Sequence, residues 1–139
     1  MATTFSNLID DVQLDIQGFT YRQDRMTYLT QACTSGDLVL NVASTENIGK
    51  GIIEIDGEMM WVDSFDRQAN TLTIAPFGRG YNATTAAAHA INAKVIISPT
   101  YPRNAIKRAI NDTINAVYPK VFATGKQTVT FLASRTTYQ

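Results

Sequence analysis

One histidine and one cysteine are the side chains in this sequence that could form a nucleophile–base pair. They are Cys33 and His89. Catalysis would require the thiol to contact the imidazole, and a third residue to orient that base. Cys33 lies near the end of a predicted strand and His89 in an alanine-rich loop, so we expect a small buried thiol and a loop histidine instead. A single cysteine also excludes an internal disulfide and any multi-cysteine metal site.

Three carboxylates gather around an Asp-Gly pair and are the next candidates for chemistry. Glu54, Asp56 and Glu58 could act as acid and base if they were held close together. We expect them instead at alternating, solvent-facing positions around a hairpin tip, where Asp is common because it hydrogen-bonds its own backbone. The periodic oxygen pattern of a calcium loop is absent from the sequence. The sequence therefore predicts no catalytic set, no metal site and no cofactor.

Two cationic motifs could contact phosphate groups. Gly78-Arg79-Gly80 lacks the Lys-Ser/Thr ending and the strand-to-helix context of a phosphate loop. Arg103, Lys107 and Arg108 form a basic patch near the start of a predicted helix, where they oppose the helix dipole. No aromatic residues are interleaved there for base stacking. We therefore expect an acidic partner for this patch, and with DNA only non-specific contact.

The composition is that of a globular chain with little surface charge. Of its 139 residues, 45% are hydrophobic and 17% charged, against about 25% charged in an average domain. Residues 1–70 hold eleven acidic and four basic residues, a net charge of −7, and residues 71–139 balance it with +7. Such a chain can stack on copies of itself or lie between unlike partners.

The sequence has neither an apolar run of the roughly 18 residues that a membrane span needs nor a secretory signal pattern, so we expect assembly in a cytoplasm.

Two amphipathic segments predict helices at either end of a β-rich region. In residues 1–24, apolar side chains recur every four residues at Leu8, Val12 and Ile16. Thr4 or Ser6 can cap this helix, and Gly18 permits a left-handed turn at its end. Residues 101–119 show a similar stripe after Pro102, with Ile106, Ile110 and Ile114. We expect this second, long helix to pack against the first.

The region between the helices has an apolar period of two, which predicts strands. Residues 52–62 read as two strands around Asp56-Gly57, because tight hairpins prefer that pair. Residues 67–70 turn into a strand at 71–74, and 38–42 and 94–97 add further strands. Roughly five short strands predict a small curved sheet or barrel within residues 25–100. Residues 76–93 form a long loop, whose alanine run can make one helical turn. The fold class is therefore α+β.

The last segment, residues 120–139, predicts a C-terminal strand or extension. Residues 127–132 alternate as a strand does, but the sequence offers that strand no partner. Either it pairs with a neighbouring molecule, or the sequence continues beyond Gln139.

Three segments together carry a resemblance to a known family. They read GIIEIDGEMMWV at 51–62, LTIAPFGRGYNATTAAAH at 72–89 and PRNAIKRAINDTINAVYP at 102–119. With the N-terminal helix, the pattern resembles the head-to-tail adaptor proteins in the neck of long-tailed bacteriophages, over residues 5–118. The loop residues that carry it are Gly78, Arg79, Gly80, Tyr81 and His89. The sequence departs from the family pattern at Asn82-Ala83 and Ile91-Asn92, where glycines are frequent.

The resemblance implies a structural protein of the virion and not an enzyme. Adaptors of this family form a ring, typically a dodecamer, which docks under the portal protein, leads to the next neck or tail protein and lines the DNA channel. A ring closes by contacts between two different faces of neighbouring subunits. We expect those faces, or a contact with an acidic portal surface, to use two charged sets: Arg103, Lys107 and Arg108 on the second helix, and Asp10, Asp11 and Asp15 on the first.

An alternative is a β-rich binding module on a tail tip or fibre, since the Arg-Gly to Ala-His motif also occurs in such proteins. Aromatic residues clustered on one sheet face would favour it, and the sequence suggests that Trp61 and Tyr81 are too few and too scattered. A hydrolase of the lysis or tail apparatus would need catalytic residues that this sequence lacks.

Overall fold

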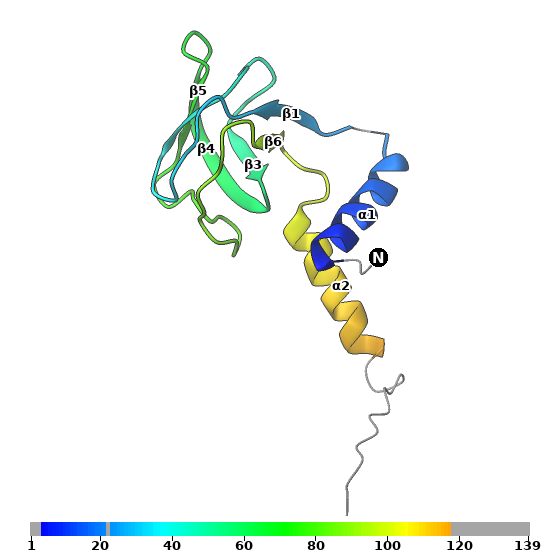
Figure 1. Cartoon of the computed structure of the whole chain (residues 1–139). Coiled ribbons are helices and arrows are strands. Elements are labelled where there is room, and N and C mark those ends of the chain that lie inside the picture. Colours follow the sequence, from blue (N-terminus) through cyan, green and yellow to red (C-terminus); the bar gives the residue numbers. More distant parts are fainter. Residues whose placement is uncertain (1–3, 22, 118–139) are drawn as a thin grey trace, which may run out of the picture.

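The computed structural model describes residues 4–21 and 23–117 and divides them between a curled β-sheet and a pair of helices (Figure 1). Helix α1 (Phe5–Gly18) precedes the sheet and α2 (Arg103–Val117) follows it. The strands between them are β1 (Arg25–Tyr28), β2 (Val39–Asn41), β3 (Gly51–Ile55), β4 (Glu58–Asp66), β5 (Thr71–Ile74) and β6 (Lys94–Ile97). Within the described residues, neither helix is long and apolar enough to span a bilayer.

The sheet is antiparallel throughout and curls until its edges meet. Its strand order is β1-β6-β3-β4-β5-β2. Just beyond the two edge strands, Leu29 pairs with Val42. The N–H of Thr30 donates to the carbonyl of Asn41 at 2.9 Å, and the N–H of Ala43 to that of Tyr28 at 2.9 Å. These bonds join the edges at that point, and we refer to the unit as the barrel.

The barrel interior is filled by apolar side chains from alternate strand positions, because successive residues of a strand point to opposite faces. The buried set includes Leu40, Ile53, Ile55, Met60, Val62, Leu72, Ile74 and Val95. Burying each such side chain contributes about 1.5–3 kcal/mol. This core fixes the register of the strands and so positions the loops between them.

Both predicted hairpins are present. At the β3–β4 turn, Asp56 has φ 50° and Gly57 has φ 89°, the left-handed conformation that a tight two-residue turn requires of both residues. At the β4–β5 turn, the Asp66 carboxylate accepts hydrogen bonds from the N–H groups of Gln68 at 2.7 Å and Ala69 at 3.1 Å. Asn70 completes that turn with φ 52°.

The two helices pack against each other and lie to one side of the barrel (Figure 1). Ile9 of α1 and Ile106 of α2 are buried. The hydroxyl of Thr4 caps α1 by accepting the N–H of Asn7 at 3.2 Å. The expected left-handed turn at Gly18 is wrong, because the chain stays right-handed beyond it, with Phe19 at φ −101°.

The α+β class is confirmed, with six strands where we expected about five. Helix α2 has 15 residues and α1 has 14, so among the described residues α2 is not the distinctly longer helix that we expected. The predicted strand at 127–132 lies outside the described residues. The expected helical turn in the alanine run is wrong: residues 84–88 are not helical, because both the N–H and the carbonyl of Ala87 are bonded to side chains elsewhere.

Candidate functional site

The carboxylate of Glu58, the first residue of β4, lies at the centre of a buried polar cluster of the barrel. It is buried and accepts two hydrogen bonds from Arg79, at 2.8 and 3.1 Å. It also accepts the N–H groups of Gly80 and Ala87, each at 2.9 Å, and lies 2.9 Å from Nε2 of His89. All five contacts come from residues 79–89. Glu58 is therefore the anchor of this loop.

The guanidinium of Arg79 uses every N–H that it has. Besides its two bonds to Glu58, it donates to the carbonyls of Thr34 at 2.8 Å and Asp37 at 2.7 Å. A fifth bond, 2.7 Å long, goes to the carbonyl of Ala87. Since arginine has five donors in a fixed planar fork, none remains for an external phosphate. Arg79 instead fastens the segment around 34–37 and the loop at 79–89 to the start of β4.

His89 is held between two carboxylates. Its Nδ1 lies 3.0 Å from Oδ2 of Asp56 and its Nε2 2.9 Å from Oε2 of Glu58. Because ionised carboxylate oxygens only accept, a ring nitrogen that carries a proton donates to the carboxylate beside it. The backbone of His89 pairs with that of Cys33 through two bonds, of 3.0 and 2.9 Å. The sequence predicted these two residues in separate elements, whereas the structure pairs their backbones. Both ring nitrogens nevertheless face carboxylates, so neither serves as a base for the buried Cys33.

The charges of this cluster stabilise one another. Burial alone raises the pKa of Glu58, but hydrogen bonds from Arg79, Ala87, His89 and Gly80 outweigh it and lower that pKa from 4.5 to about 2. The hydrogen bond to Glu58 raises the pKa of Arg79 further above its ordinary value. A carboxylate with this many donors stays ionised despite being buried. We refer to Glu58, Arg79 and His89 as the loop clamp.

Two glycines allow the loop to approach the sheet as closely as it does. A Cβ on Gly78 would lie 2.9 Å from the carbonyl oxygens of Ala75 and Trp61. Gly80 has φ 61°, and its Cβ would lie 2.9 Å from the carbonyl oxygen of Thr84. Both distances are shorter than side chains tolerate, so the Gly-Arg-Gly spacing serves the backbone path of this loop.

The loop presents aromatic side chains beside β4. Tyr81 lies with its ring centroid 5.6 Å from that of Trp61. The sequence suggested that these two residues are scattered, and the structure brings them together. Phe77, at the preceding turn, is 100% exposed and has φ 63°. A bulky side chain in that conformation is uncommon and strained.

The acidic residues around the β3–β4 turn are not all solvent-facing, and that expectation is wrong for Glu54 as well as for Glu58. Glu54 is buried, and its carboxylate accepts the backbone N–H of Arg103 at 3.1 Å, at the first residue of α2. A negative charge at a helix N-terminus is favourable. Burial is nevertheless the largest influence and raises the pKa of Glu54. Asp56 is exposed, as expected.

The structure separates the six predicted interface residues into one internal pair and four exposed charges. Arg103 forms an ion pair with Asp10 and donates to the hydroxyl of Ser6 at 3.2 Å, all within one chain. The other four side chains are exposed: Asp11, Asp15, Lys107 and Arg108.

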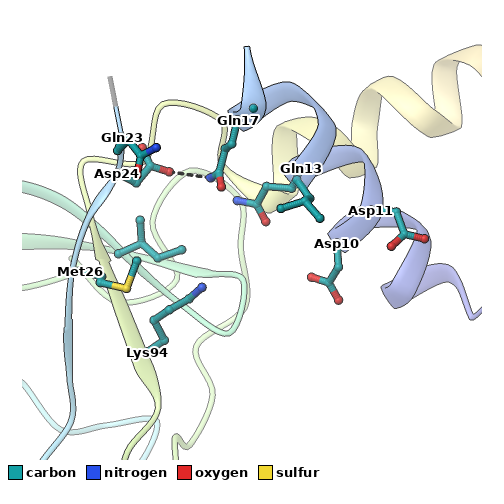
Figure 2. Close-up of a pocket in the computed structure, with 11 residues that line it drawn as sticks. Asp10, Asp11, Gln13, Gln17, Gln23, Asp24, Met26 and Lys94 are labelled. Atoms are coloured by element: carbon teal, nitrogen blue, oxygen red, sulfur yellow. Dashed lines mark hydrogen bonds between the residues drawn. The ribbon is translucent and has the colours of Figure 1, made fainter. Parts of the chain in front are cut away.

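An opening of about 540 Å³ separates α1 from the barrel (Figure 2). On the helix side it is lined by Asp10, Asp11 and Gln13, and on the barrel side by Met26 and Lys94. Gln17 donates to Asp24 at 3.0 Å across one end, which ties α1 to the segment before β1. Among the described residues, no group of three or more His, Cys, Asp or Glu side chains is placed to hold a metal ion.

Sequence comparison identifies no relative: no protein-family model matches the chain, and no curated protein matches it.

Proposed function

We propose that the chain is a structural subunit of a bacteriophage neck, an adaptor that forms a ring between the portal protein and the tail and lines the channel for DNA. The observation that carries the proposal is the loop clamp. The motif through which the chain resembles head-to-tail adaptors, Arg79 to His89, has its charged groups bonded internally. Such a motif shapes a rigid loop, as an assembly protein needs, and leaves its groups no role in turnover.

The charge distribution supports the same role. The acidic and basic sets lie on different helices, and the exposed members, Asp11 and Asp15 on α1 and Lys107 and Arg108 on α2, are available to neighbouring molecules. Ring subunits meet through two different faces, which complementary charge suits. The partners are then further copies of the chain, an acidic portal surface and the next neck or tail protein, with non-specific DNA contact inside the channel.

The test is a virus whose gene for this chain is interrupted, complemented by the intact chain as a control. The adaptor role predicts separate heads and tails, with DNA poorly retained in the heads, in electron micrographs of the lysate. Complete tailed particles with retained DNA would contradict it.

A binding module of a tail tip or fibre is the second candidate, and the contact between Trp61 and Tyr81 favours it. Exposed aromatic side chains are common anchors in recognition surfaces. The same interrupted virus separates the two functions, because loss of a tail-tip module leaves tailed particles that fail to adsorb to cells.

A further inference from the structure

The pair of helices and the barrel are two units that meet at few points. Among the described residues, no Cα atom of α1 or α2 lies within 8 Å of a Cα atom in any strand. Openings of about 540 Å³ and about 360 Å³ lie between the two units, and Figure 2 shows α1 standing off the barrel across the larger one. The two helices, in contrast, pack against each other. They can therefore move as one body relative to the barrel.

The chain crosses between the two units twice, before β1 and after β6. The second crossing, residues 98–102, reads Ser-Pro-Thr-Tyr-Pro. It begins at Ser98, whose N–H donates to the carbonyl of Ile52 at 2.9 Å and so ties it to β3. Because proline fixes its own φ, a change in the direction of α2 falls chiefly on Thr100 and Tyr101, between the two prolines.

Asp24 holds both crossings at once. Its Oδ1 accepts the N–H and the hydroxyl of Thr100, each at 3.0 Å. Its Oδ2 accepts the side-chain amide of Gln17 in α1 at 3.0 Å, a bond that Figure 2 shows at one end of the opening. One carboxylate therefore fixes a residue on which the direction of α2 depends and ties α1 to the same point.

The other polar contacts between α2 and the barrel lie at the start of that helix. Glu54 accepts the N–H of Arg103 at 3.1 Å, and the amide of Asn104 donates to the carbonyl of Asn82 at 3.3 Å. Contacts at a pivot shift least when the far end swings, so they hold the axis while permitting rotation. A swing of about 20° around Arg103 would move Ala116 by about 7 Å, since that stretch of helix spans about 20 Å.

We propose that residues 98–102 are a hinge on which the two helices swing together relative to the barrel, and that Asp24 is the latch that holds them in the position seen here. Hinges of this kind consist of a few residues between rigid elements, which absorb the change in backbone dihedral angles. A molecule that contacts the helices changes their angle at the cost of the bonds to Asp24, without unfolding either unit. The swing does not depend on the proposed function and is measured on the purified chain.

The experiment measures the distance between two spin labels on the full chain. The labels are attached at Thr73→Cys on β5 and Ala116→Cys on α2, both exposed positions. Every sample also carries Cys33→Ala, which removes the one native thiol. With the latch intact we expect one narrow distribution of distances. Asp24→Ala should broaden it and add distances that differ from the original mean by about 5 Å or more, because the helix acts as a lever about 20 Å long.

Further variants separate release of the latch from a general loss of structure. Gln17→Ala and Thr100→Val each remove one bond to Asp24, so each should broaden the distribution less than Asp24→Ala does. Glu46→Ala, at an exposed position, is the control and should leave the distribution unchanged. The fluorescence of Trp61, the one tryptophan of the chain and part of β4, shows in each variant that the barrel remains folded.

A distance distribution that is the same with and without Asp24→Ala overturns the latch. So does an intact chain whose distribution is already as broad as that of the variant, because nothing then holds the position. Equal broadening by Glu46→Ala contradicts the role of Asp24 as well. Should the barrel of Asp24→Ala fail to fold, Gln17→Ala and Thr100→Val decide the matter, and unchanged distributions in both overturn the proposal.

Discussion

Both carboxylate oxygens of Glu58 face the guanidinium of Arg79, with Oε1 2.8 Å from Nε and Oε2 3.1 Å from Nη2. The two side chains are 2% and 7% exposed, respectively. A bidentate pair in such a setting is strong, but it depends on both partners, since a buried charge left alone is costly. The pair therefore makes the path of residues 79–89 conditional on a single carboxylate at the start of β4.

Glu58→Gln should destabilise the fold strongly while keeping the shape of the side chain. It removes the negative charge and leaves the Arg79 guanidinium buried without its counter-charge, which costs about 3–5 kcal/mol. Urea denaturation at neutral pH measures the change in the free energy of unfolding. The control is Glu46→Gln at an exposed position, which should stay within about 0.5 kcal/mol. Equal effects of the two substitutions would remove the loop clamp from the account.

Stability should also fall in acid because of the same carboxyl group. The pKa of Glu58 is lowered from 4.5 to about 2 in the folded protein, so its stabilisation is fully present above pH 4.5 and is lost as the pH falls towards 2. The loss amounts to about 3 kcal/mol. Denaturation at a series of pH values measures the free energy of unfolding and checks this loss. In a Glu58→Gln variant, the decrease in that free energy between pH 4.5 and 2 should be smaller by this amount.

Glu54 should act with the opposite sign. Burial raises its pKa in the folded state, so protonation of Glu54 favours folding, and its contribution to stability increases as the pH falls through that range. Glu54→Gln should therefore steepen the acid-induced loss of stability in the same denaturation series. A shallower curve in this variant would contradict the assigned direction.

Gly57→Val should destabilise the β3–β4 hairpin by about 1–2 kcal/mol. Gly57 has φ 89°, and a β-branched residue resists that conformation. Gly49→Val is the matched control, because Gly49 has open space around its Cβ position and no positive φ. An unchanged melting temperature for Gly57→Val, or an equal drop for both variants, would count against the turn geometry.

The sequence predicted what is locally encoded. The hairpin at Asp56-Gly57 follows from the chemistry of two adjacent residues, and the strands follow from their alternating apolar positions. Burial of Glu58 could not be predicted in this way, because its partners lie beyond residue 78 and only the fold brings them together. An acidic residue next to a turn is normally solvated, and its own neighbours give no sign that an arginine will cover it.

Contacts between the two helices could not be predicted for the same reason. Their stripes and the Thr4 cap were readable from spacing, but the ion pair between Asp10 and Arg103 joins opposite ends of the described chain. The predicted interface set was therefore mixed, with one pair used internally and four charges left exposed. The aromatic contact between Trp61 and Tyr81 likewise depends on the path of the loop and not on their spacing in sequence.

Locating the chain in an assembled virus tests the central claim most directly. Particles carrying a tagged copy, labelled with gold particles against the tag and viewed by electron microscopy in negative stain, should show label at the junction between head and tail. Class averages of the same junction should show a ring at that level. Label at the tail tip or on fibres, with none at the neck, would contradict the adaptor role and support the binding module.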